Sequence, residues 1–188
     1  MPTVELHVLQ GYGPDEKRRL GEALTDAVRF IVPAPAEAIT VMIHEMNTEH
    51  YYRGRTQRCG APALPDPKEI VRLYLEAMEQ RNILVAASML APNFVMQFPG
   101  APPMTELQEL IDWAKLRYQS VIKNYEGFDA MQSEATAAVV YCRGTLAGVW
   151  PDGATFDGIR FIDRFEVESG KITKQDVWND IADRKAKA

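Results

Sequence analysis

Apolar and polar residues alternate at the start of the chain, over residues 2–10. Val4, Leu6 and Val8 occupy every second position, so they share one face of an extended segment. This alternation predicts a half-buried strand, which the glycines and proline of residues 11–14 end. Residues 38–46 repeat the alternation and predict a second strand.

Between these strands the apolar spacing changes to that of a helix. Asp15 is placed to cap the N-terminus of the helix, and Pro33 is placed to end it. One apolar stripe recurs at helical spacing and comprises Leu20, Ala23, Leu24, Ala27, Val28 and Ile31. The first part of the chain therefore predicts a strand–helix–strand unit. About 60 residues bury little surface, so we expect this unit to need partners.

Proline and glycine then concentrate in residues 60–67, a composition typical of a linker. We therefore predict a domain over residues 1–59, a linker over 60–67 and a second domain over 68–188. In that domain, helical patterns precede a long region of strand patterns with turn signals at Asp152-Gly153 and Ser169-Gly170. The helices are expected near 70–78, 83–90 and 105–119, and the strands over 93–98 and 121–179. This order predicts an α+β fold in which a curved antiparallel sheet wraps helices.

Composition narrows the possible functions. The chain is 46% hydrophobic and 25% charged, as in ordinary globular proteins, and its net charge is −5. No basic cluster suited to nucleic acid stands out, and no long apolar run or signal peptide is present. Cys59 and Cys142 have no metal-ligand spacing. We therefore expect a cytoplasmic protein with no nucleic-acid or membrane partner and no metal or cofactor.

Pro2 is the first candidate for catalysis. Removal of Met1 would leave Pro2 with a secondary amine, and an α-amino group has a pKa of about 7.7–8.0 that burial lowers. Such an amine suits proton abstraction next to a carbonyl. Alternatively, Pro2 has no role, because proline is common after an initiator methionine.

The opening strand with Pro2 resembles that of the 4-oxalocrotonate tautomerase family. Ala34-Pro35, the strand Val41–Met46 and His50-Tyr51 resemble the second half of its members, so the likeness covers residues 1 to about 58. The resemblance implies a β-α-β fold that assembles into multimers. It also implies that Pro2 shuttles a proton during keto–enol tautomerisation of a 2-keto or 2-hydroxydienoate acid.

Two positions depart from that family. Where its members bind the substrate carboxylate with arginines, this chain has Tyr12 and Thr40, while Tyr51 matches the aromatic residue that walls the pocket. Arg53 and Arg55 follow the second strand and could clamp a carboxylate instead. Alternatively, both are surface residues of a polar loop. We therefore list Tyr12, Tyr51, Arg53 and Arg55 as candidate substrate-binding residues.

Residues 68–180 resemble the nuclear-transport-factor-like superfamily, nearest to SnoaL-like polyketide cyclases and ketosteroid-isomerase-like proteins. The likeness rests on the helix with Tyr74, the strand 93–100 and the closing segments 161–167 and 170–178. It implies a cone-shaped α+β barrel with a cavity between sheet and helices. Phe98 stands where isomerases of this fold have an aspartate base, which argues against steroid-isomerase chemistry.

Asp163 is the candidate catalytic carboxylate of the second domain. It lies on the apolar face of its strand, with Phe161 and Phe165 two residues away on either side. Desolvation there would raise its pKa, as a general acid or base requires. Alternatively, Asp163 pairs with an arginine such as Arg160 or Arg164, or lies at a β-bulge. Candidate cavity residues are Tyr74 and Trp178.

These observations leave three hypotheses. The first is a small-molecule isomerase with Pro2 as general base and a second ligand-binding cavity in the C-terminal domain. The second is a non-catalytic ligand-binding protein that uses the first unit as an oligomerisation scaffold, and the third is a cyclase or dehydratase that uses Asp163. Each implies a small organic acid or hydrophobic small molecule as ligand, and a homo-oligomer, either dimer or hexamer.

Overall fold

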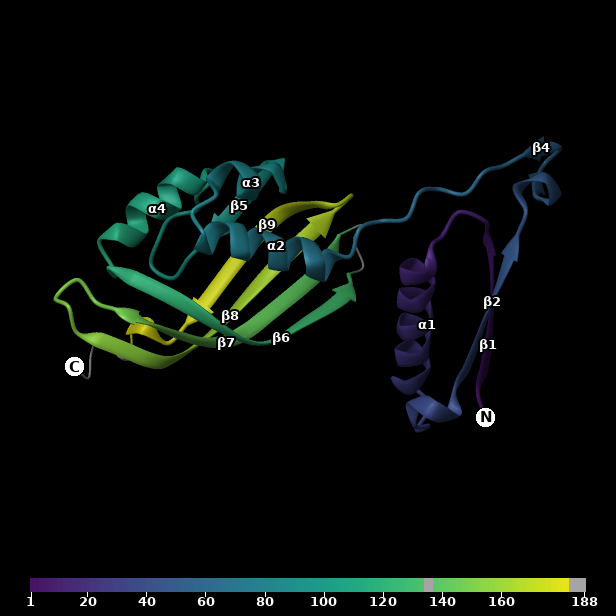
Figure 1. Ribbon diagram of the computed structural model, residues 1–188, viewed down its shortest axis with the longest axis horizontal. Coiled ribbons are helices and arrows are strands. Elements are labelled where there is room, and N and C mark those ends of the chain that lie inside the picture. Colours follow the sequence, from purple (N-terminus) through teal and green to yellow (C-terminus); the bar gives the residue numbers. More distant parts are fainter. Residues whose placement is uncertain (134–136, 183–188) are drawn as a thin grey trace. The chain divides into compact units, whose positions relative to one another are not determined.

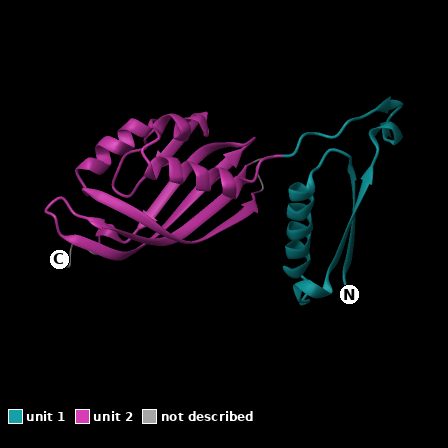
Figure 2. Cartoon of the chain, in the orientation of Figure 1, with its two compact units in different colours: residues 1–63 teal, residues 64–188 magenta. Residues whose placement is uncertain are grey.

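The structure is a computed structural model that describes residues 1–133 and 137–182 (Figure 1). Its internal contacts divide the chain into two compact units, Met1–Ala63 (unit 1) and Leu64–Ala188 (unit 2; Figure 2). The division falls inside the proline-rich residues 60–67. Each unit is described by itself.

Unit 1 is a β-α-β unit. Strand β1 (Thr3–Leu9) leads into helix α1 (Pro14–Arg29) and strand β2 (Thr40–Met46). The strands pair in parallel from Thr3 opposite Thr40 to Leu9 opposite Met46. Strand β2 begins two residues later than expected because Ala36–Ala38 forms a short 3-10 helix. A second 3-10 helix (Thr48–His50) precedes a hairpin of strands β3 (Tyr52–Arg53) and β4 (Thr56–Gln57).

Helix α1 starts two residues earlier than the sequence indicated. Gly13 is its N-cap, Pro14 is its first residue, and no side chain caps it, so the expected cap by Asp15 is wrong. Asp15 lies instead in the first turn, where its negative charge complements the helix dipole. The side of α1 that carries Lys17 faces the sheet, because Lys17 pairs with Glu45 of β2 at 2.7 Å.

One face of the unit 1 sheet lacks a covering layer. The structure describes all of Met1–Ala63, and none of these residues is buried. The first buried residue of the chain is Val71. On the face away from α1, the rings of His7 and His44 stack with centroids 4.9 Å apart. A two-stranded sheet with one helix cannot enclose a core, so unit 1 by itself has no buried interior.

Unit 2 is a curved sheet with helices on one side (Figure 1). Helices α2 (Pro67–Glu79) and α3 (Ile83–Ser88) come first, followed by β5 (Leu90–Gln97) and α4 (Leu107–Lys115). Four long strands complete the sheet: β6 (Ser120–Gln132), β7 (Ala138–Val149), β8 (Thr155–Glu168) and β9 (Lys171–Asn179). The strand order is β5-β9-β8-β7-β6, with β5 parallel to β9 and the other pairs antiparallel. This is the α+β architecture that the sequence predicted.

The core of unit 2 lies between the sheet and helix α2. Its largest fully buried apolar side chains are Tyr74, Phe165, Met96, Ile159 and Ile172. Helix α4 is shorter than the expected 105–119, because a capping box of Glu106 and Glu109 starts it and Leu116 ends it. Within the described residues, no helix has the length and apolar character needed to cross a membrane.

Candidate active sites

Pro2 is fixed at one end of the unit 1 sheet. Its carbonyl oxygen accepts a hydrogen bond from the backbone N–H of Thr40 at 3.0 Å, one residue before β1 begins. This bond continues the parallel pairing of β1 and β2, so the main chain at Pro2 is held in place by the sheet. Met1 precedes it and is 92% exposed, which leaves the bond between them accessible.

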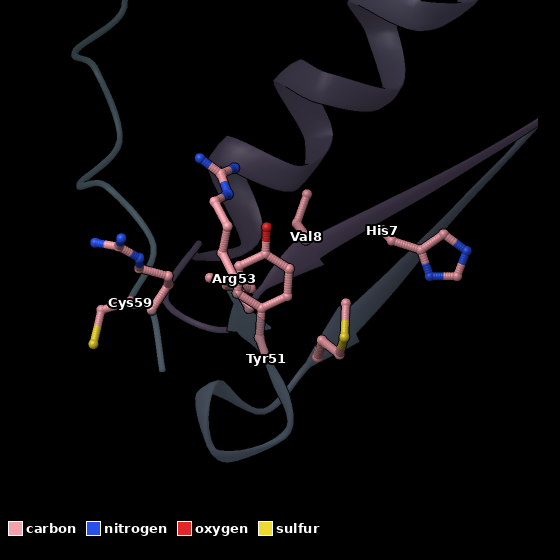
Figure 3. Close-up of a pocket in the computed structure, with 8 residues that line it drawn as sticks. His7, Val8, Tyr51, Arg53 and Cys59 are labelled. Atoms are coloured by element: carbon pink, nitrogen blue, oxygen red, sulfur yellow. The ribbon is translucent and has the colours of Figure 1, made fainter. Parts of the chain in front are cut away.

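A pocket of about 400 Å³ lies at the other end of the same sheet (Figure 3). The strands contribute His7, Val8, Leu9 and Met46 to its wall. The segment after β2 contributes Tyr51, Arg53, Arg58 and Cys59. The pocket therefore brings together the rings of Tyr51 and His7 and two guanidinium groups, which suits a planar anion.

The hairpin after β2 explains which arginine enters this pocket. Gly54 and Arg55 form its two-residue loop with φ of 53° and 65°, the left-handed values of a type I′ turn. Arg53 precedes the loop and lines the pocket, whereas Arg55 at the tip does not. The N–H of Arg58 donates to the carbonyl of Tyr51 at 3.1 Å and fixes the returning segment. Arg58 was not identified from the sequence, although it lies only three residues after Arg55.

A single chain does not bring Pro2 to this pocket. Pro2 precedes the first pair of the parallel register, while Val8 and Leu9 at its last pairs line the pocket. At about 3.3 Å per residue, the path along β1 from Pro2 to Val8 is roughly 20 Å. Tyr12 also lies outside the pocket, and its hydroxyl donates to the carbonyl of Ala61 at 3.2 Å.

Unit 2 contains a second, smaller cavity of about 130 Å³ between sheet and helices. Its apolar wall consists of Leu75, Met78, Phe98, Leu110, Ala114 and Val121. Its uncharged polar side chains are Tyr74, Tyr118, Tyr125 and Gln175, and its charged ones are Glu79, Arg81 and Lys123. Phe98 packs against Trp113 with ring centroids 5.3 Å apart, so the wall here is aromatic.

Asp163 lies behind the wall of this cavity. It is fully buried, and its Oδ2 accepts hydrogen bonds from the Lys123 ammonium and, at 3.4 Å, from Gln175 Nε2. Its Oδ1 is buried with no hydrogen-bond partner among the described residues. Burial raises the pKa of the Asp163 carboxyl, and the nearby Lys123 ammonium opposes that rise.

Neither Arg160 nor Arg164 pairs with Asp163, so the expected arginine pairing is wrong. Arg160 pairs with Asp180 at 2.7 Å, and Arg164 pairs with Glu166 at 2.7 Å. Both arginines alternate with Asp163 along β8, so they project from the opposite face of the sheet. Lys123 faces the cavity side instead, where its Nζ also lies 4.6 Å from the Phe161 ring centroid.

Of the two expected cavity residues, only Tyr74 lines the cavity. Its hydroxyl donates to Gln175 Oε1 at 3.2 Å, and burial, followed by the charge of Asp163, raises the pKa of its phenol. Trp178 is 51% exposed and lies opposite Ile162 on the other face, so its placement in the cavity wall is wrong. The register of β8 and β9 shifts after Ile172, which puts Ile172 and Trp178 on opposite faces despite their even spacing.

Among the described residues, no group of three or more histidine, cysteine, aspartate or glutamate side chains is placed to hold a metal ion. The ammonium, guanidinium and phenol groups of the two candidate sites suit the binding of anions and the transfer of protons.

Comparison with known proteins gives a family match for each unit. A family model described as tautomerase enzyme matches residues 2–56, and one described as SnoaL-like domain matches residues 71–175. The 2-hydroxymuconate tautomerase of Bacillus subtilis (strain 168) is 41% identical over 51 residues, which cover 27% of this chain and 82% of that protein. A probable tautomerase of Bacillus cereus is 41% identical over 54 residues, 29% of this chain and 88% of that protein.

Solved structures match unit 2 in fold. An NTF2-like protein of unknown function from Burkholderia pseudomallei K96243 aligns with a TM-score of 0.51 and 17% sequence identity. The alignment covers 63% of this chain and 93% of that chain. At this identity the likeness extends to the fold only.

Proposed function

The chain belongs to the tautomerase family over residues 2–56 and to the SnoaL-like family over residues 71–175, and on that premise we propose that it is a keto–enol tautomerase whose general base is Pro2. The tautomerase relatives support isomerase-like chemistry in unit 1. After loss of Met1, the neutral amine of Pro2 takes the proton of an enol hydroxyl. It then returns that proton to a carbon of the conjugated chain, so no atom is gained or lost.

The position of Pro2 carries this proposal. The sheet holds Pro2 by its carbonyl, which leaves the nitrogen free to become the chain terminus. An α-amino pKa of about 7.7–8.0 is close to physiological pH, so the amine can both accept and release a proton. A base carried by a flexible side chain would have several freely rotating bonds, whereas a terminal proline at the start of a strand has few.

We further propose that two copies of the chain form each site. Pro2 and the pocket of Tyr51 and Arg53 lie at opposite ends of one sheet, roughly 20 Å apart along β1. A two-fold axis that placed two such sheets antiparallel would bring Pro2 of one copy to Arg53 of the other. The uncovered face of the unit 1 sheet and the lack of buried residues in this unit support such packing.

Within this shared site, the arginines supply the binding energy. The guanidinium groups of Arg53 and Arg58 would hold the substrate carboxylate, replacing the arginines absent at Tyr12 and Thr40. The Tyr51 ring would cover the conjugated chain and exclude water, which keeps the Pro2 amine neutral. The substrate class that fits is a small 2-hydroxydienoate or 2-keto acid.

The experiment combines intact-mass measurement with turnover of 2-hydroxymuconate, followed by ultraviolet absorbance, for wild type and Pro2→Ala. Alanine also permits removal of Met1, so the variant differs only in its terminal amine. We expect the mass of a chain without Met1, and a roughly 10²–10⁴-fold lower kcat/KM for Pro2→Ala. Retention of Met1, or equal turnover by the variant, would overturn the proposal and leave unit 1 as an oligomerisation scaffold.

The cavity of unit 2 is the second part of the proposal, as a binding site for a small molecule. Its support is the combination of an aromatic and aliphatic wall with a few polar groups, which is common in ligand sites. Asp163 does not line this cavity, so in this proposal it acts by positioning Lys123 rather than by contacting a substrate.

A further inference from the structure

The size of the unit 2 cavity limits its ligand. Its volume of about 130 Å³ is below the roughly 300–1,000 Å³ of pockets that hold drug-sized molecules. A small ligand matches this volume better than a drug-sized one. The apolar wall of Phe98, Leu110 and Val121 suits a small flat hydrocarbon or aromatic group.

Positively charged side chains line this cavity together with a phenol, because Lys123, Arg81 and Tyr118 all belong to its wall. Burial raises the pKa of the Tyr118 phenol, while the positive charges of Lys123, Arg117 and Arg81 act to lower it, and the negative charge of Asp163 acts to raise it. An anion beside Tyr118 would therefore meet two cations and a phenol.

Glu79 is the acidic side chain among those that line this cavity, and the rest of its wall is mostly aliphatic and aromatic. A ligand with one carboxylate and one apolar end would therefore place its carboxylate beside Lys123, Arg81 and Tyr118 and its apolar end against that wall.

The main chain at Arg81 supports a role for its side chain. Arg81 follows the C-cap residue Gln80 of α2 and has a φ of 58°, in the left-handed region where glycine is usual. Arginine at this position costs backbone energy that glycine would avoid. Its side chain lines the cavity, which gives the strained residue a function that glycine could not supply.

The ammonium of Lys123 is held in position from behind. The Asp163 carboxylate accepts one hydrogen bond from this ammonium and another from the Gln175 amide. The Gln175 amide oxygen in turn accepts a hydrogen bond from the Tyr74 hydroxyl. An ammonium group has three donors, so this arrangement leaves donors free for a ligand. The Lys123 side chain is 23% exposed, while that of Asp163 is fully buried, so the cation is the accessible member of the pair.

We propose that the unit 2 cavity binds a small planar monocarboxylate, whose carboxylate is held by Lys123, Arg81 and the Tyr118 hydroxyl. Its apolar part lies against Phe98, Leu110 and Val121. This inference rests on the proposal that the cavity is a ligand site, and it is independent of Pro2 chemistry.

The test uses the intrinsic tryptophan fluorescence of the full-length protein. All three tryptophans, Trp113, Trp150 and Trp178, belong to unit 2, and Trp113 packs against Phe98 of the cavity wall. The signal therefore reports binding to unit 2 and is silent on the arginine pocket of unit 1. The probes are benzoate and its uncharged analogue benzamide. We expect benzoate to bind and benzamide to bind at least about tenfold more weakly.

Two variants separate binding from folding. Arg81→Gly relieves the left-handed residue, so its melting temperature should equal or exceed that of wild type while benzoate affinity falls roughly tenfold. The double variant Lys123→Met/Asp163→Asn removes both charges of the buried pair together and should lose benzoate affinity similarly. Lys174→Met, in an exposed position that pairs with Asp176, is the matched control and should bind as wild type.

Equal binding of benzoate and benzamide would overturn the proposal, as would wild-type benzoate affinity in both Arg81→Gly and the double variant. A failure of the Pro2 assay leaves this titration unchanged, because the fluorescence does not depend on unit 1. The two proposals can therefore fail separately.

Discussion

The ammonium of Lys123 on β6 donates to the carboxylate of Asp163 on β8, past the intervening strand β7. The Asp163 side chain has no exposure, whereas 23% of the Lys123 side chain is exposed. The pair thus has one member that water cannot solvate and one that faces the cavity. Replacing both charges of such a pair is often neutral, but removing one leaves the other without compensation.

Lys123→Met is predicted to destabilise unit 2 strongly. Loss of the ammonium leaves the buried Asp163 carboxylate with Gln175 alone, which costs about 3–5 kcal/mol. Urea unfolding followed by tryptophan fluorescence measures this loss in unit 2. The double variant Lys123→Met/Asp163→Asn should recover most of the stability, and a double variant as unstable as Lys123→Met would contradict the reasoning.

The effect of Asp163→Asn on stability is predicted to depend on pH. Burial raises the pKa of Asp163 above its ordinary value of 3.8, so the folded chain holds this proton more tightly than the unfolded chain. The stabilisation that comes from this raised pKa is fully present below pH 3.8. It is lost as the pH rises through the pKa that Asp163 has in the folded chain.

Asparagine does not titrate, so the free energy of unfolding of the variant minus that of wild type should rise with pH across this window. Subtracting the two curves removes the other carboxyl groups, which both proteins share. A difference that is constant with pH, or that falls as the pH rises, would show that Lys123 outweighs burial.

Gly144→Ala is predicted to destabilise the unit 2 sheet. A Cβ at Gly144 would lie 1.9 Å from the carbonyl oxygen of Asn124, a main-chain atom of the neighbouring strand β6. The strands would have to separate, at a cost of roughly 1–3 kcal/mol. Gly21→Ala in helix α1 is the contrasting variant, because a Cβ there meets nothing within 4 Å and should stabilise α1 by about 0.5–1 kcal/mol. Thermal unfolding of the two variants measures both changes.

Alternation along the chain predicted the burial of Asp163 but not its partner. Phe161, Asp163 and Phe165 share the inner face of β8, as the sequence indicated. Lys123 lies 40 residues earlier, on a strand where Ile122 is 53% exposed and the lysine faces the cavity. An isoleucine that faces outward beside a lysine that faces inward is the reverse of the usual pattern of a sheet. The pairing of Lys123 with Asp163 therefore becomes visible only in the strand order of the folded sheet.

The unit 1 pocket could also be predicted only in part from the sequence. The sequence identified Tyr51 and Arg53, both of which line the pocket, because the family resemblance and the charge pattern pointed to the segment after β2. It could not rank Arg53 above Arg55, since that depends on the left-handed residues of the hairpin loop. The separation of Pro2 from this pocket follows from the parallel register, which spacing along the chain does not give.

Arg53→Ala is predicted to lower kcat/KM for 2-hydroxymuconate by roughly 10–100-fold, mainly through KM. A guanidinium–carboxylate contact contributes about 1.5–3 kcal/mol, and substrate and transition state both keep the carboxylate. Arg58→Ala should behave similarly because Arg58 lines the same pocket. Arg29→Ala, at the exposed end of α1, is the control that should leave the kinetics unchanged. An effect of Arg53→Ala on kcat alone would assign Arg53 to the chemical step instead.

Mixing two impaired variants is predicted to restore activity when the substrate concentration is well below KM, because Pro2 and Arg53 of one chain lie at opposite ends of its sheet. In an isologous pair of Pro2→Ala with Arg53→Ala, one site receives the intact Pro2 and the intact Arg53, and the other site receives neither. After joint unfolding and refolding at equal amounts, half of the pairs are mixed. The turnover should therefore reach roughly a quarter of the wild-type value.

The two variants refolded separately and then assayed together provide the control, since they cannot exchange partners if the assembly is stable. Restored turnover only after joint refolding would place Pro2 and Arg53 of different copies in one site. Absence of recovery, with both variants folded and assembled as wild type, would mean that each chain completes its own site. In that case unit 1 would have to change conformation to bring Arg53 to Pro2.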